Sequence, residues 1–151
     1  MFDLTKGVPS LETCKRLKEL GFPQEGTGYY WSKWKPDKSY ILAITFDGRN
    51  YHRVDGWTSG PPDIKIKAPV IDEIILYLPD KIEYKDEYGD KYIAHLLIER
   101  LDNNWRGGYA VFGWDDWGFI KTLEDEELIN LFTNIYIWAK QNNYISTEKE
   151  E

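Results

Sequence analysis

The sequence predicts an α+β fold in which three helices accompany an antiparallel sheet or sheets, in the order α-β-β-β-α-β-β-β-α. Two observations support this class. Three stretches repeat apolar residues at helical spacing, and six short runs have the aromatic and β-branched composition of strands. The connections are short, which favours antiparallel pairing with helices on one face of a sheet. Residues 1–145 are expected to form a single domain, followed by a disordered tail at 146–151.

Each predicted helix has recognisable ends. The first follows Ser10, a good N-cap residue, and stops at Gly21, which favours the left-handed conformation that terminates helices. The second lies between Pro69, which suits a first helical turn, and Pro79, which cannot continue a helix. The third is predicted to begin at Thr122, which opens a capping-box-like pattern followed by four carboxylates at the positive end of the helix dipole.

The six predicted strands are bounded by residues that favour turns. They cover residues 29–34, 40–46, 51–55, 81–85, 91–101 and 105–112. The run 91–101 carries apolar residues on both faces, as expected of a strand inside a sheet. The stretch 56–62 is rich in Gly and Pro and is predicted to be a loop.

Aromatic residues are abundant, while the residues of common catalytic centres are scarce. The 151 residues include seven Trp, eleven Tyr and six Phe, but only two His and one Cys. Not all of these rings fit inside one compact core, so some are expected at the surface or at an interface. A metal site, a thiol centre and a catalytic triad are not expected, and no cofactor is predicted. Cys14 is interpreted as a small core residue of the first helix.

The charge is negative and unevenly distributed. The formal net charge is −7 at pH 7: residues 1–67 carry eleven Lys and Arg against eight Asp and Glu (+3), and residues 68–151 carry eight against eighteen (−10). This balance argues against binding of double-stranded nucleic acid, which requires cations at its phosphates. A single Cys forms no internal disulfide, no run reaches the ~20 apolar residues of a membrane span, and the N-terminus does not resemble a signal peptide. A cytoplasmic protein is therefore expected.

Three segments of the chain together resemble a known family. They are a helix that runs into Leu20-Gly21-Phe22-Pro23-Gln24, a helix between Ala68-Pro69 and Leu78-Pro79, and a final helix through Trp138 that ends in Asn142-Asn143-Tyr144-Ile145. In this order they resemble small hypothetical proteins found in phage and prophage genomes. The resemblance implies a mobile-element protein that acts in the cytoplasm of a bacterial host. It supplies no activity and no catalytic residues.

The segment 113–118, between the last predicted strand and the last helix, is a candidate protein-binding loop. It reads Gly-Trp-Asp-Asp-Trp-Gly, and Trp side chains flanked by charge are typical of interaction hot spots. Its adjacent carboxylates leave a metal-dependent hydrolase open, but the spacing supplies no further oxygen ligands. The predicted protein-binding residues are Trp57, Trp114, Asp115, Asp116 and Trp117.

A second group of residues combines aromatic rings with cations. Such a combination can stack on a base and bind a phosphate, although an ordinary strand with aromatic residues inward and Lys outward has the same pattern. The predicted ligand-binding residues are Trp31, Lys33, Trp34, Arg49 and Arg53.

We therefore expect a non-enzymatic protein-interaction module of phage or prophage origin. Its expected partner is a host or phage protein, and one form of this hypothesis is an acidic inhibitor of a host protein. The alternative is a protein that binds a nucleotide or another small molecule through the aromatic and basic residues. Exposed rings also leave a homodimer open. Membrane binding is not expected.

Overall fold

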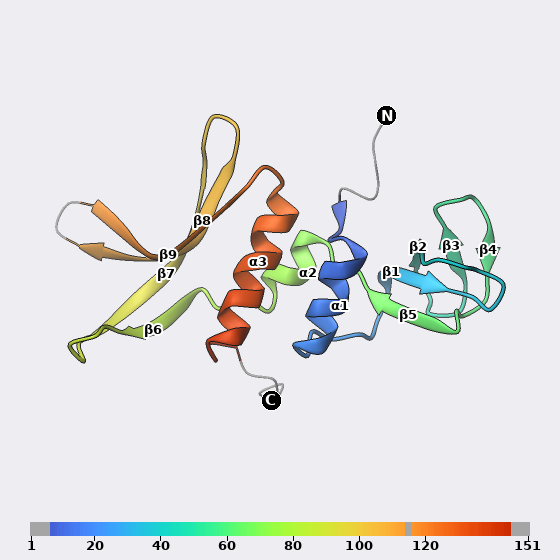
Figure 1. The fold of residues 1–151 in the computed structure, drawn as a ribbon, viewed down its shortest axis with the longest axis horizontal. Helices are drawn as coiled ribbons and strands as arrows, with labels where there is room; N and C mark the ends of the chain where they lie inside the picture. The colour runs from blue at the N-terminus through green and yellow to red at the C-terminus, as the bar shows by residue number, and fades with distance from the viewer. Residues whose placement is uncertain (1–6, 114–115, 146–151) are drawn as a thin grey trace. The chain divides into compact units, whose positions relative to one another are not determined.

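A computed structural model describes residues 7–113 and 116–145 of the chain. Within these residues it contains three helices and nine strands, and the strands form two antiparallel sheets (Figure 1). The predicted α+β class is confirmed. The predicted order is confirmed in outline, with five strands and then four where three and three were expected. The chain divides into two compact units, Met1–Glu73 and Ile74–Glu151. The expectation of one domain stays a prediction, and the predicted tail lies outside the described residues.

The first unit consists of one helix and a five-stranded sheet. Its elements are α1 (Leu11–Glu19), β1 (Gly28–Lys33), β2 (Ile41–Thr45), β3 (Tyr51–Arg53), β4 (Thr58–Ser59) and β5 (Ile64–Lys67). All neighbouring strands are antiparallel, in the order β4-β3-β2-β1-β5. The last strand therefore pairs with the first. The sequence did not predict β4, which lies in the expected loop, or β5, whose four residues form too short a run to be recognised.

Both predicted ends of α1 are confirmed. The Ser10 side chain accepts a hydrogen bond from the Thr13 N–H at 3.3 Å, as an N-cap residue does. At the other end Gly21 has a φ of 90°, and the Phe22 N–H donates to the Leu17 carbonyl at 2.9 Å. This is the Schellman arrangement, and it favours glycine because a side chain destabilises a positive φ.

An apolar cluster joins α1 to one face of the five-stranded sheet. Its buried members include Cys14 of α1, Leu42 of β2 and Ile66 of β5. Cys14 has no exposed surface, and burial raises the pKa of its thiol to about 12. The interpretation of Cys14 as a core residue is therefore confirmed.

Cys14 is expected to be chemically inert in the folded protein. At mildly alkaline pH, we expect it to react with an aromatic disulfide reagent at least about 100-fold more slowly than in the unfolded chain, because only the thiolate is nucleophilic. The absorbance of the released thiol measures both rates, with free cysteine as the control for each buffer. Similar rates in the folded and unfolded states would contradict the burial of this side chain.

The second unit consists mainly of a four-stranded sheet and a long helix. Its strands, in spatial order, are β6 (Lys81–Lys85), β7 (Lys91–Arg100), β8 (Trp105–Gly113) and β9 (Asp116–Asp125), and α3 (Leu128–Gln141) follows them. In the strand order β7 lies between β6 and β8, as predicted for 91–101, but among the described residues 91–94 pair with β6 alone and 97–100 pair with β8 alone. The short helix α2 (Ile71–Ile75) spans the boundary between the units in the sequence. Within residues 7–113 and 116–145, no helix is long and apolar enough to cross a membrane.

The third helix begins later than the sequence predicts. Thr122 is not a cap but lies in β9, opposite Gly108 of β8. The helix begins at Leu128, and its N-cap residue Glu127 makes no side-chain capping hydrogen bond. The predicted capping box is therefore wrong, because pairing of β9 with β8 along its length outweighs the local preference of the acidic run for a helix start.

Helix α3 packs closely on the four-stranded sheet. The rings of Tyr109 on β8 and Trp138 on α3 have centroids 5.8 Å apart. At Gly107, a Cβ atom would overlap the Cδ1 atom of Ile98 and lie 3.1 Å from the Leu97 carbonyl oxygen, both on β7. The missing side chain therefore leaves room for the Ile98 side chain beside β8.

Candidate functional site

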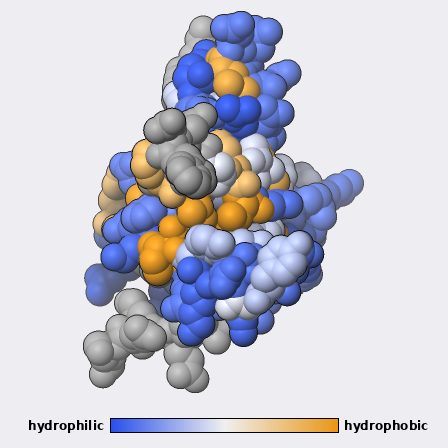
Figure 2. Space-filling view, turned by 90° about the vertical axis from the view of Figure 1, so that its left-hand side faces the viewer, coloured by the Kyte–Doolittle hydropathy of each residue, from blue (hydrophilic) through white to orange (hydrophobic). Residues whose placement is uncertain are grey.

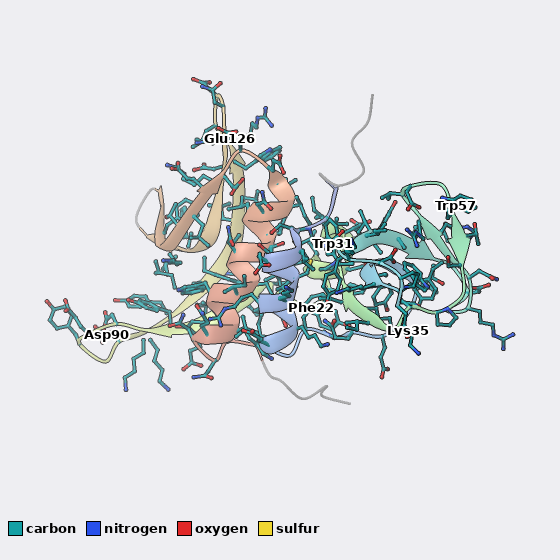
Figure 3. The ribbon with its side chains drawn as sticks, turned by 45° about the vertical axis from the view of Figure 1, so that its right-hand side comes forward. Phe22, Trp31, Lys35, Trp57, Asp90 and Glu126 are labelled. Atoms are coloured by element: carbon teal, nitrogen blue, oxygen red, sulfur yellow. The ribbon has the colours of Figure 1, made fainter. Side chains whose placement is uncertain are left out.

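Trp57, one of the predicted protein-binding residues, has an exposed side chain in the structure. It lies between β3 and β4, well separated from Trp31 within the first unit (Figure 3). Its exposed fraction is 72%. Of the five Trp residues whose side chains the structure describes, Trp57 alone is exposed, while the other four are partly buried. The expectation that some rings reach the surface is therefore confirmed at this position.

The backbone holds Trp57 in a tight turn, residues 53–57, which we call the Trp57 turn. The Arg53 N–H donates to the Trp57 carbonyl at 2.8 Å, and the Gly56 N–H donates to the Arg53 carbonyl at 3.0 Å. Gly56 has a φ of 100°, which the turn requires and which glycine tolerates. The Asp55 carboxylate accepts a hydrogen bond from the Trp57 N–H at 3.3 Å. The indole therefore extends from a turn whose backbone conformation is restricted by hydrogen bonds.

The Arg53 side chain adds a second restraint to the Trp57 turn. Its guanidinium donates to both Asp55 carboxylate oxygens, with distances of 3.1 Å and 2.6 Å, and it lies 3.5 Å from a carboxylate oxygen of Asp37. The hydrogen bond from Arg53 holds the pKa of Asp55 below its usual value, and the same bond raises the pKa of Arg53. A planar guanidinium bound at two atoms fixes both partners.

Arg53 is the first of a series of aromatic rings and cations that contact one another on one face of the five-stranded sheet. We call this set the aromatic–cation row; it consists of Arg53, Trp34, Tyr51, Lys65, Tyr30 and Lys67. Arg53 lies 5.0 Å from the ring centroid of Trp34, and the Trp34 ring meets Tyr51 edge-on at 6.4 Å. The Lys65 Nζ donates to the Tyr51 hydroxyl at 3.2 Å and lies 4.8 Å from the ring centroid of Tyr30.

The row ends in an ion pair between the buried Lys67 and the partly exposed Glu73. The Lys67 Nζ lies 4.9 Å from the ring centroid of Tyr30 and 2.8 Å from the Glu73 carboxylate. The Tyr30 hydroxyl donates to the Gly26 carbonyl at 2.6 Å, and burial raises the pKa of Tyr30 to about 12. Tyr30 is fully buried and Tyr51 is 1% exposed. The rings of Tyr30 and Tyr51 are therefore part of the interior of the first unit. Through the contact between Trp34 and Arg53, the aromatic–cation row packs against the Trp57 turn.

The structure brings together two of the five predicted ligand-binding residues, Trp34 and Arg53. Trp31 instead packs against the apolar cluster of α1 and donates its indole N–H to the Pro9 carbonyl at 3.1 Å. Lys33 lies over the ring of Tyr40, 5.9 Å from its centroid. Arg49 lies in the β2–β3 turn and is exposed. Nucleotide binding stays a prediction, and the contacts that Trp34 and Arg53 make with each other and with Asp37 favour a supporting role for both.

The other predicted protein-binding residues lie beyond what the structure describes. Trp114 and Asp115 fall outside the described residues. Asp116 and Trp117 belong to β9, but their side chains are not described. In the part of the chain that is described, no three His, Cys, Asp or Glu residues are placed to hold a metal ion.

Sequence reasoning missed the residues that fix Trp57. Asp37 and Asp55 bind Arg53 from separate segments, and Tyr51 contacts Trp34 from another strand. One local signal was available, because Asp55-Gly56 is a turn-forming pair directly before the Trp. The contacts over Trp34 depend on strand pairing and leave no comparable signal.

Comparison of the chain with protein-family models, with curated proteins and with solved structures finds no match in any of the three.

Proposed function

We propose that this protein is a non-enzymatic protein-interaction module whose first unit binds a partner protein through Trp57. One observation carries the proposal. An indole that is 72% exposed extends from a turn that Asp55 and Arg53 fix through hydrogen bonds. Exposed Trp side chains in fixed positions are typical of interface hot spots.

The physical reason is preorganisation. A flexible anchor loses conformational freedom when it binds, which weakens association, whereas the Trp57 turn is already ordered in the free protein. The indole presents a large apolar area with a single N–H donor, so it suits a pocket with an apolar wall and one acceptor. We expect Trp57 to contribute about 2 kcal/mol or more to binding.

We also propose a class of partner and a cellular compartment for this interaction. The resemblance to phage and prophage proteins supports a host or phage protein as the partner and the bacterial cytoplasm as the compartment. The acidic second half, with a charge of −10 over residues 68–151, supports the specific form of an inhibitor that occupies a basic surface of a host protein. Trp114, Asp115, Asp116 and Trp117 remain predicted as a second set of contacts.

Replacing Trp57 by Ala should abolish this binding while leaving the fold intact. The tagged protein and its Trp57→Ala variant are used to capture partners from a lysate of the natural host cells, and each captured protein is quantified by mass spectrometry. We expect the true partner to fall by about 30-fold or more, which corresponds to a hot-spot contribution of about 2 kcal/mol. Stability should change by less than about 0.5 kcal/mol, because Trp57 makes few buried contacts.

Tyr88→Ala is the matched control. Tyr88 is an aromatic residue of the second unit with an exposed fraction of 82%, so the substitution removes comparable exposed ring surface. The partner that Trp57→Ala loses should remain bound to Tyr88→Ala. Capture of the same proteins in the same amounts by the wild-type protein and by Trp57→Ala would remove the proposal.

A further inference from the structure

The four-stranded sheet separates into two hairpins at one end. β7 pairs with β8 only as far as His95 opposite Ala110. Beyond this pair, β7 continues to Lys91 alongside β6, and β8 continues to Gly113 alongside β9. The two hairpins diverge from this point (Figure 1). Among the described residues, positions 91–94 of β7 therefore pair with a strand on one side only.

The open edge of β7 presents backbone hydrogen-bonding groups. Successive residues of an antiparallel strand direct their N–H and C=O groups to opposite sides. The Leu96 N–H donates to the Asp80 carbonyl at 2.8 Å, so the even-numbered residues of β7 face β6 and the odd-numbered residues face the β8 side. Ile93 and Lys91 are odd-numbered and lie beyond the last β7–β8 pair. Their N–H and C=O groups therefore point into the gap between the hairpins.

Apolar side chains are exposed on the strands that border this gap. Ile93 on β7 is 50% exposed, and Phe112 on β8 is 55% exposed. Tyr92 is 40% exposed. Figure 2 looks onto the side of the second unit and shows hydrophobic residues in the middle of its surface. Exposed apolar side chains next to an open strand edge are suited to an added strand with alternating apolar residues.

Carboxylates lie at the outer end of the open edge. Asp86 organises the β6–β7 turn by accepting hydrogen bonds from the Tyr88 and Asp90 N–H groups, each at 2.9 Å. Figure 3 shows Asp90 at the tip of this hairpin. The Lys91 ammonium is paired with Glu83 at 3.3 Å, and Lys85 lies opposite Lys91 on β6. Asp90 directly precedes the edge residue Lys91, so a cation on an added strand would lie close to the Asp90 carboxylate.

We propose that this edge binds an extended segment of a partner protein by strand addition. The segment places an apolar residue opposite Ile93 and a Lys or Arg near Asp90. Its backbone bonds to the N–H and C=O groups of Ile93 and Lys91 and so extends the sheet. A second copy of this chain is less suited to the edge, because two chains of net charge −7 repel each other. This site is in the second unit and does not depend on the Trp57 turn.

Hydrogen exchange of the full chain tests the proposal. The probe is a synthetic hexapeptide that alternates Val with Lys and Thr. One control peptide has N-methyl groups that block the backbone donors of one edge, and another has Glu in place of Lys. When the probe peptide is added, we expect the Ile93 and Lys91 amides to exchange at least about tenfold more slowly than in the free protein. The Tyr92 and Ala94 amides, which face β6, should not change, and both control peptides should have little effect.

A charge variant gives a second, independent readout. Asp90→Asn should weaken binding of the Lys-containing peptide by about threefold or more, while Asp102→Asn in the β7–β8 turn should have no effect. The proposal is overturned if no amide of the open edge is protected. It is also overturned if the N-methylated peptide protects equally. If the same amides become protected from exchange when the protein concentration is raised without any peptide, the edge binds a second copy of the chain. This result would also overturn the proposal.

Discussion

Replacement of Lys67 by Met is expected to lower the free energy of unfolding of the first unit by about 2–4 kcal/mol. The Lys67 side chain is 3% exposed, and its Nζ donates to the Glu73 carboxylate at 2.8 Å and to the Thr27 carbonyl at 2.5 Å. Gly28 makes room for it, because a Cβ there would lie 2.7 Å from the Nζ. Met keeps the apolar stem but removes the ammonium from both acceptors, so the Thr27 carbonyl loses its bond from Lys67 and the Glu73 carboxylate keeps only that from the Val70 N–H, at 3.2 Å. Denaturant-dependent hydrogen exchange of the β1 amides measures the loss.

Lys15→Met is the control for Lys67→Met. Lys15 forms an ion pair with Glu12 at 3.5 Å in the same unit, but the two side chains are 41% and 83% exposed. Solvent screens such a pair, so the control should lose less than about 0.5 kcal/mol. If the two variants lost the same amount, the buried pair would have no special role in the stability of the first unit.

Replacement of Gly108 by Ala is expected to lower the free energy of unfolding of the second unit by about 3 kcal/mol or more. A Cβ at this position would overlap the carbonyl oxygen of Lys121 and lie 2.9 Å from its carbonyl carbon. Both atoms belong to the backbone of β9, so relief requires β8 and β9 to move apart. Thermal unfolding, with hydrogen exchange of the β8 amides as a local probe, measures the effect.

Gly118→Ala is the matched control in the neighbouring strand. Among the described residues, a Cβ at Gly118 would meet the Val111 carbonyl oxygen alone, at 4.0 Å, which is an ordinary contact. The control should change stability by less than about 1 kcal/mol in either direction. A Gly108→Ala variant as stable as Gly118→Ala would show that the two strands are not packed as closely as described.

The elements that the sequence predicts well are those whose ends are encoded locally. Ser10 and Gly21 define α1 because each acts on backbone groups within a few residues. The segment after β8 illustrates the opposite case. The sequence predicts a helix start at Thr122 and the acidic run 124–127, yet the residues up to Asp125 form β9 because β8 offers pairing along the strand. Such tertiary pairing is invisible to a local reading of propensity.

The candidate site was predictable in part for the same reason. Surplus aromatic content indicated that some rings reach the surface, and Trp57 does. Its preorganisation was not predictable, because Arg53 joins the Trp57 turn to Trp34 and Asp37, which lie in a different part of the chain. Trp31 and Trp34 are three positions apart and have different partners, because alternation along the strand directs them to opposite faces of the sheet.

Photo-crosslinking at position 57 tests the central proposal most directly. A photoreactive phenylalanine derivative replaces Trp57 in one variant and Lys35, an exposed residue after β1, in another, and both are irradiated in the natural host cells. We predict a discrete covalent adduct with one partner protein at position 57, which excess wild-type protein suppresses and excess Trp57→Ala protein does not. The same adducts at both positions, or none at position 57, would contradict a binding role for Trp57.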